Sequence, residues 1–121
     1  RYSLQPHDRF DESRVERFAR GVAQPLVTLP VRAATPPLQP PFIVEARRSV
    51  ITRLANRADG DAHIVRLYNP GAEPDSVAVR GADGARCTVQ RADAREQPGE
   101  ALDGLIELRP YDIVTLRVRC N

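Results

Sequence analysis

The sequence predicts a mainly β protein: a small seven-stranded antiparallel β-sandwich preceded by a short strand, one helix and a proline-rich connector. Three observations predict it. After residue 41, seven short apolar segments follow one another, most of them separated by turn residues; only one stretch has helical periodicity; and six of the 11 prolines lie between residues 25 and 41. Short strands at regular spacing are typical of a sandwich, with a barrel as the alternative closure.

The first 24 residues predict a strand followed by a helix. Tyr2, Leu4 and Pro6 alternate with polar residues over 1–7, which is a strand pattern. Apolar side chains then share one helical face: Val15, Phe18, Ala19 and Val22. Asp11 is the expected N-cap and Gly21 the expected C-cap. The opposite face is expected to be solvated and carries Arg14, Glu16, Arg17 and Arg20.

The prolines of residues 25–41 exclude a helix or a central strand, so this stretch predicts an extended connector. The sequence therefore divides into a lead-in segment, 1–41, and a β-sandwich domain, 42–121. The chain contains no Met and opens on Arg1 within a strand pattern. We therefore expect it to be a piece of a longer polypeptide.

The domain's strands are expected at 42–46, 50–55, 62–68, 76–80, 86–91, 104–108 and 112–119. Turn residues separate most of them, at 58–61, 69–71, 81–84 and 97–99. The segment 81–84 (GADG) has the composition of a hairpin turn. In the last strand Val114, Leu116 and Val118 share one face with Cys120, and in the third strand Val65 and Leu67 share one with His63.

The composition argues against two classes of partner. Basic residues number 18, none of them lysine, against 16 acidic residues, and the signs are interspersed. Nucleic-acid binders usually show a basic stripe, and a membrane span needs about 20 apolar residues, so neither a nucleic-acid nor a membrane partner is expected. The exclusive use of arginine reflects a GC-rich coding sequence.

The two cysteines, Cys87 and Cys120, lack metal-ligand spacing. They are expected to be buried thiols on inward strand faces. A disulfide would require neighbouring strands and an oxidising compartment. Without a disulfide framework, and with a bacterial-like GC-rich coding sequence, the chain favours a cytoplasmic location.

No catalytic residue and no metal site is predicted. Asp8, Asp11 and Glu12 lie near His7 and could hold a metal, but acidic residues are common at a helix start. His63 is expected to be a partly buried, hydrogen-bonded strand residue. Nucleophile elbows and phosphate-binding glycine loops are absent from the sequence.

A weak binding candidate is the group Arg66, Tyr68 and Asn69. Arg66 and Tyr68 share a strand face, and with Asn69 they could line a sugar contact at a domain interface. The simpler interpretation is an arginine stem packed beside a tyrosine, with the polar ends solvated.

Three segments resemble one family in order along the chain. Leu54 and Ala55, the acidic turn 59–61 and the run 64–70 (IVRLYNP) resemble the C-terminal β domain of α-mannosidases of glycoside hydrolase family 38, which carries an Arg-Leu-Tyr strand after a charged turn. Residues 108–117 (LRPYDIVTLR) are similar to the family's closing strand, and residues 1–7 (RYSLQPH) to its Tyr-x-x-x-Pro-His segment.

The resemblance implies a non-catalytic C-terminal domain that buttresses a catalytic domain acting on α-mannosides. The family's enzymes are retaining and bind zinc through His and Asp residues of the catalytic domain, and no position here matches those motifs. The chain alone is therefore expected to be inactive and to contain no cofactor. Its expected partners are the catalytic domain of the same polypeptide and, through it, mannose-containing carbohydrate. The alternative is a stand-alone carbohydrate-binding or protein-interaction module.

Overall fold

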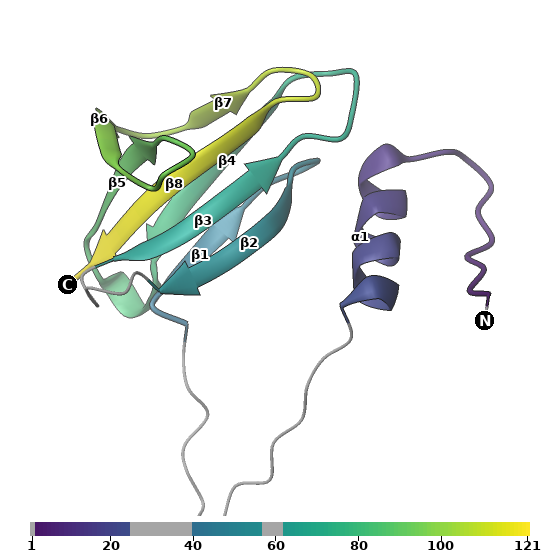
Figure 1. The fold of residues 1–121 in the computed structure, drawn as a ribbon, viewed down its shortest axis with the longest axis horizontal. Helices are drawn as coiled ribbons and strands as arrows, with labels where there is room; N and C mark the ends of the chain where they lie inside the picture. Colours follow the sequence, from purple (N-terminus) through teal and green to yellow (C-terminus); the bar gives the residue numbers. More distant parts are fainter. Residues whose placement is uncertain (1, 25–39, 57–61) are drawn as a thin grey trace, which may run out of the picture.

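The structure, a computed structural model, describes residues 2–24, 40–56 and 62–121. Two antiparallel sheets face each other, and one helix lies beside them (Figure 1). The mainly β class and the sandwich are confirmed, with eight strands in place of the seven predicted. The turn predicted at 58–61 and most of the connector at 25–41 fall outside the described residues.

The smaller sheet has three strands in the order β1-β4-β7. Their bounds are β1 Phe42–Glu45, β4 Asp75–Gly81 and β7 Ile106–Leu108. The larger sheet has five strands in the order β2-β3-β8-β5-β6. Their bounds are β2 Val50–Asn56, β3 His63–Tyr68, β8 Ile113–Cys120, β5 Cys87–Ala92 and β6 Pro98–Leu102.

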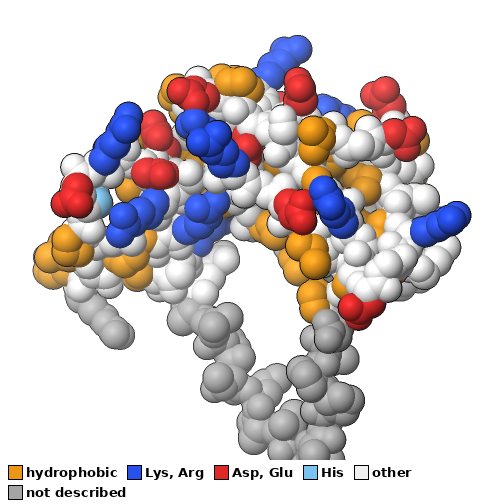
Figure 2. Space-filling model, turned by 180° about the vertical axis from the view of Figure 1, so that it is seen from behind, with side chains coloured by type: hydrophobic (Ala, Val, Ile, Leu, Met, Phe, Trp, Pro, Cys, Tyr) orange, Lys and Arg blue, Asp and Glu red, His pale blue; other side chains and the backbone are white. Residues whose placement is uncertain are grey.

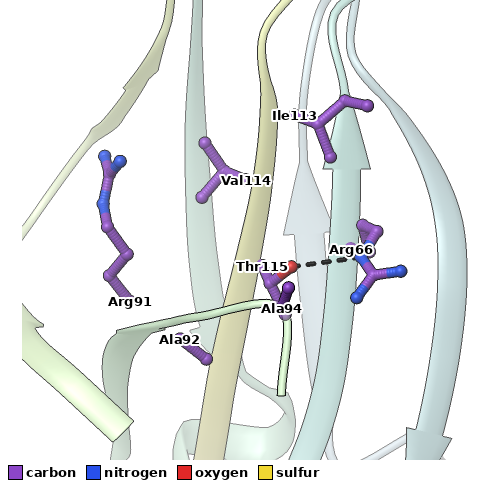
Figure 3. Close-up of a pocket in the computed structure, with 7 residues that line it drawn as sticks. All are labelled: Arg66, Arg91, Ala92, Ala94, Ile113, Val114 and Thr115. Atoms are coloured by element: carbon purple, nitrogen blue, oxygen red, sulfur yellow. Dashed lines mark hydrogen bonds between the residues drawn. The ribbon is translucent and has the colours of Figure 1, made fainter. Parts of the chain in front are cut away.

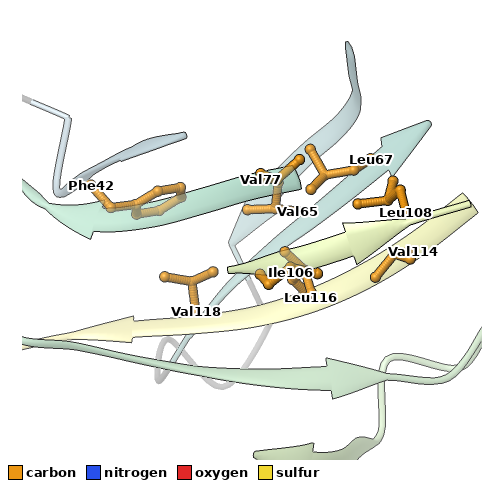
Figure 4. Packing of buried hydrophobic residues seen from close by; sticks show 9 residues of the cluster. All are labelled: Phe42, Val65, Leu67, Val77, Ile106, Leu108, Val114, Leu116 and Val118. Atoms are coloured by element: carbon orange, nitrogen blue, oxygen red, sulfur yellow. The ribbon is translucent and has the colours of Figure 1, made fainter. Parts of the chain in front are cut away.

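The hydrophobic core lies between the two sheets (Figure 4). The smaller sheet contributes Phe42, Val77, Ile106 and Leu108, and the larger sheet Val65, Leu67, Val114, Leu116 and Val118. The predicted inward face of the last strand is therefore confirmed, because alternate side chains of a strand point to the same side. His63 lies at the edge of this core, with its ring centroid 5.3 Å from that of Phe42 and its Nδ1 2.7 Å from Oδ1 of Asn56.

The additional strand, β6, begins within the segment predicted as a turn at 97–99. The turn comes earlier, because the Asp93 carboxylate accepts hydrogen bonds from the backbone N–H groups of Arg95 (2.8 Å) and Gln97 (2.9 Å). Such a side-chain turn reverses the chain before Pro98, and a proline is tolerated as the first residue of an edge strand.

The hairpin predicted at 81–84 is wrong. β4 belongs to the smaller sheet and β5 to the larger one, so the segment carries the chain between the sheets, with a short 3₁₀ turn η1 at Ala82–Gly84. A Cβ atom at Gly81 would lie 1.9 Å from the carbonyl oxygen of Ala85. Glycine is required here for this close approach of two backbone segments.

The expectation of two free thiols is also wrong, because Cys87 and Cys120 form a disulfide. They are opposite each other in the register of β5 and β8, with Cα atoms 4.1 Å apart. The N–H of Asn121 donates to the carbonyl oxygen of Arg86, which makes the cysteines a closely spaced non-hydrogen-bonded pair. The bond removes one ground for expecting a cytoplasmic location, since disulfides persist in oxidising compartments.

The helix α1 (Glu12–Ala23) begins as predicted: the Asp11 carboxylate accepts a hydrogen bond from the N–H of Arg14 (2.9 Å). The predicted C-cap at Gly21 is wrong, because the helix continues to Ala23 and the Gln24 N–H donates to the carbonyl oxygen of Arg20. The strand predicted over 1–7 is absent from the described residues 2–7. A strand needs a neighbour to satisfy its backbone groups, and Tyr2 and Leu4 are almost fully exposed.

The orientation of α1 differs in part from the prediction for its two faces. Arg17 and Arg20 line a cavity with Val44, Ala46 and Val50 at the side of the sandwich where β1 leads into β2. Within the apolar stripe Phe18 is half-buried, whereas Val15 is 39% and Val22 51% exposed. Long arginine stems can cover apolar groups in this way while their charged ends remain near water.

The surface seen in Figure 2 carries basic and acidic side chains side by side, with hydrophobic groups between them. Among residues 2–24, 40–56 and 62–121, the structure contains no helix with the length and apolar character needed to cross a membrane.

Candidate functional site

The candidate site lies on the outer face of the five-stranded sheet, around Arg66 of β3. Its cross-strand partners are Thr115 on β8 and Arg53 on β2. Arg66 Nε donates a hydrogen bond of 3.1 Å to Oγ1 of Thr115 (Figure 3). Thr115 is only 8% exposed. A buried hydroxyl therefore fixes the direction of an arginine that reaches the surface.

The other two candidates have different surroundings. Tyr68 is half-buried on the same face, opposite Ile113, which is 61% exposed. Asn69 is fully buried and points into the end of the sandwich. The structure thus places Arg66 and Tyr68 on one surface and Asn69 beneath it.

Asn69 connects two loops through its side chain. Its Nδ2 donates to the carbonyl oxygens of Glu73 (2.8 Å) and Arg109 (3.1 Å), and its Oδ1 accepts from the N–H of Gly71 (3.2 Å). Its backbone N–H donates to the carbonyl oxygen of Asp112. These bonds join the β3–β4 connection to the β7–β8 turn, so the geometry assigns Asn69 a structural role.

The β7–β8 turn presents Tyr111, a residue that the sequence reasoning did not single out. Tyr111 is 61% exposed and has a φ of 59°, in the left-handed region that favours glycine. The Asp112 N–H donates to the carbonyl oxygen of Arg109 and closes the turn. The available signal was Pro110, because proline favours the position before a residue with positive φ in a type II turn.

A cavity of about 410 Å³ opens beside Arg66. It lies where β5 leaves β8 and the chain enters the β5–β6 turn, and its lining consists of Arg66, Arg91, Ala92, Ala94, Ile113, Val114 and Thr115 (Figure 3). Guanidinium groups and one hydroxyl are its polar elements, and none of the lining residues is an acid, a histidine or a cysteine. The arrangement can bind a polar group, but its lining side chains offer no pair for acid–base chemistry.

The β5–β6 turn reaches over this face of the sheet. Glu96 has a φ of 65°, and its Oε1 lies 3.1 Å from Nη2 of Arg53 on the edge strand β2. The ion pair therefore links the edge strand β2 to the turn at the opposite edge of the five-stranded sheet, across β3 and β8. The sequence did not point to Thr115, Arg53 or Glu96. Only the strand registers place Thr115 and Arg53 opposite Arg66, and only the β5–β6 turn brings Glu96 to Arg53.

A second buried polar group, Asp75, supports the framework. Its Oδ2 accepts hydrogen bonds from the N–H groups of Ser49 (2.7 Å) and Arg48 (3.0 Å). Burial by itself would raise the pKa of Asp75. Hydrogen bonds from the N–H groups of Ser49, Arg48 and Ser76, together with the nearby Ser49 hydroxyl, outweigh burial and lower that pKa below its usual value. The Ser49 hydroxyl contributes from nearby, without the geometry of a regular hydrogen bond.

The residues near the helix start do not form a metal centre. The Asp11 carboxylate caps the helix, and the N–H of Arg14 and the hydroxyl of Ser13 lower its pKa. His7 lies against Phe10, with ring centroids 6.3 Å apart. Over the described part of the chain, no group of three or more His, Cys, Asp or Glu side chains is suited to a metal ion. The described residues therefore offer no ligand set for the zinc ion, which the family resemblance places in the catalytic domain.

The geometry defines a class of protein: an antiparallel β-sandwich domain whose outer sheet face carries a small cavity with mostly apolar walls and arginine side chains. A family model, the glycosyl hydrolases family 38 C-terminal beta sandwich domain, matches residues 48–116. The match runs from the residues before β2 into β8, and the chain belongs to this family. No curated protein sequence matches the chain at a significant level.

Proposed function

We propose that the chain is the non-catalytic C-terminal domain of an α-mannosidase-like glycoside hydrolase, and that it buttresses the catalytic domain of the same polypeptide. The observation that carries the proposal is the family match over residues 48–116, which covers most of the sandwich. Membership of a C-terminal domain family implies a neighbouring domain, and inter-domain contact is an ordinary role for such a sandwich.

The surface of the chain offers groups for that contact. The apolar stripe of α1 is partly exposed, with Val15 and Val22 on it, and Tyr111 stands out from the β7–β8 turn. Aromatic residues are enriched at protein interfaces because they bury a large area. The zinc ion of the family would belong to the catalytic domain, and mannose-containing carbohydrate would be bound there.

The proposal is tested by separating the two parts. The chain alone, with zinc added, should not hydrolyse an aryl α-mannoside. The longer polypeptide from which residues 42–121 are deleted should lose activity at a lower temperature than the intact polypeptide. Measurable turnover by the chain alone would refute the non-catalytic assignment, and an unchanged inactivation temperature would refute the buttressing role.

A stand-alone carbohydrate-binding module is the competing function. Such a module would stack a sugar on an aromatic ring, and Tyr68 beside Ile113 is the place on the candidate face where this could occur. A titration with mannose and manno-oligosaccharides, followed by amide chemical shifts, separates the two functions. Saturable shifts around Tyr68 would favour the module, whereas their absence would favour the buttress.

A further inference from the structure

We propose that Arg66 forms a binding site for a carboxylate carried on a short apolar stem, in the cavity between the start of β8 and the β5–β6 turn. The inference concerns the geometry of this chain and does not depend on the proposed function.

The first argument is the imbalance of charge on this face. Arg53 and Arg66 are direct cross-strand partners, and like charges in such positions repel. The Glu96 carboxylate approaches Arg53 and neutralises one of the two guanidinium groups. Among the described residues, the Nη atoms of Arg66 have no acceptor, and its Nε is bonded to the neutral Thr115. Within the described part of the chain, one positive charge at the cavity wall therefore lacks a counter-charge.

The second argument is the direction of Arg66. Because Thr115 holds the Nε atom, the remaining edge of the guanidinium, formed by its two Nη groups, is left for another ligand. Two parallel N–H groups at this edge match the two oxygens of a carboxylate. The bond to Thr115 restricts the side chain, so that less conformational entropy is lost when the ligand binds.

The third argument is the lining of the cavity. Ala92, Ala94, Ile113 and Val114 provide small and apolar walls, and Arg91 adds a second positive charge at the rim. Free phosphate is strongly hydrated and gains little from such walls. A carboxylate with a carbon chain can place its head at Arg66 and its stem against Ile113. The lining thus favours an organic carboxylate over inorganic phosphate.

The test is a titration of the chain with sodium butyrate at constant ionic strength, since exposed charges are screened by salt. Amide and arginine Hε chemical shifts report binding. We expect saturable shifts at Arg66, Ala94 and Thr115, with a dissociation constant of the order of millimolar, as suits a partly exposed ion pair. The neutral analogue butyramide should give no saturable shift at these residues, and phosphate should bind more weakly than butyrate.

Two variants and a control localise the effect. Arg66→Gln should weaken butyrate binding at least about fivefold, and Arg66→Lys should weaken it less, because it keeps the charge but loses the paired donors. The control Arg80→Gln removes the same charge from the outer side of the smaller sheet, where Arg80 pairs with Glu45, and should leave binding unchanged. Equal affinity in Arg66→Gln and Arg80→Gln, equal shifts with butyramide, or no saturable shift in the original chain would overturn the proposal.

A second arm, which alone rests on the proposed function, distinguishes two sources of the carboxylate. If butyrate binds both the chain and the longer polypeptide, the natural occupant is a free organic acid. If butyrate binds the chain alone, an acidic side chain of the neighbouring domain already fills the cavity. The titration of the chain alone decides whether the site exists. A failure of the buttressing proposal would therefore not be mistaken for the absence of the site.

Discussion

The side chain of Asn69 offers the sharpest test of how the two end loops are held together. It is fully buried and makes three hydrogen bonds to backbone groups of the β3–β4 connection and the β7–β8 turn. In Asn69→Ala these bonds are lost. The carbonyl groups of Glu73 and Arg109 belong to exposed residues and can be rehydrated, whereas the N–H of Gly71 is in a buried residue and loses its acceptor.

The expected cost can be estimated bond by bond. Each lost hydrogen bond costs about 1 kcal/mol, and a buried donor left without a partner adds about 1 kcal/mol more, so the free energy of unfolding should fall by about 3–4 kcal/mol. Urea unfolding followed by circular dichroism measures it. With an m value of about 2 kcal/mol per M, the midpoint should fall by about 1.5–2 M.

The matched control is Asn56→Ala. Asn56 is exposed, and among the residues that the structure describes its side chain bonds to the ring of His63, so its removal should cost less than about 1 kcal/mol. Asn69→Asp should be at least as damaging as Asn69→Ala at neutral pH, because a carboxylate cannot donate to two carbonyl oxygens. If Asn69→Ala costs no more than the control, Asn69 does not join the loops and the structural role assigned to it is wrong.

Three further predictions concern the framework. Hydrogen bonds lower the pKa of Asp75 in the folded protein, so its contribution to stability is present above about pH 4 and is lost as the pH falls through the lowered pKa. In Asp75→Asn the free energy of unfolding, measured with urea, should therefore fall less steeply as the solution is acidified. Reduction of Cys87–Cys120, which closes a separation of 33 residues, should lower the free energy of unfolding by about 4 kcal/mol, and an unchanged urea midpoint in dithiothreitol would contradict the pairing. Gly81→Ala should lower the melting temperature, since its Cβ would come within 1.9 Å of a backbone oxygen. In contrast, a Cβ at Gly21 would meet nothing within 4 Å outside the neighbouring backbone of its own helix, so Gly21→Ala should raise the free energy of unfolding by up to about 1 kcal/mol. Equal melting temperatures of the two variants would refute the close approach at Gly81.

The parts of the fold that depend on local pattern were predictable from the sequence. The alternation of Val114, Leu116 and Val118 predicted the core face of the last strand, and Asp11 predicted the start of the helix. In both cases the signal lies within a few residues, because strand alternation and N-capping are properties of a short segment.

The parts that depend on distant pairing were not predictable. The disulfide requires Cys87 and Cys120 to be opposite each other, and this follows from the register of β5 on β8. The hairpin prediction for 81–84 failed for the same reason, because composition specifies a turn but does not say which sheet receives the next strand. The prediction of a solvated face on α1 was wrong in part, because Arg17 and Arg20 line a cavity at the side of the sandwich, and this depends on where the helix packs.

The candidate site shows the same division. Sequence placed Arg66 and Tyr68 on one strand face, since residues two apart in a strand share a side. The sequence pattern could not show that Thr115 and Arg53 lie opposite Arg66, because this depends on the registers of two strand pairs. Nor could it show that Glu96 pairs with Arg53, because this depends on the path of the β5–β6 turn. Asn69 follows the strand directly, and only the folded loops show that it turns inward.

The disulfide at the end of β8 has a mechanical consequence. β8 is hydrogen-bonded to a neighbour on each side, and its last residue is covalently joined to the first residue of β5. Tension applied at the C-terminus is therefore transmitted through the S–S bond into β5. While the bond is intact, β8 cannot be peeled from β5 one hydrogen bond at a time from this end, nor can the two strands slide past each other there, so β5 and β8 take up the load as one unit.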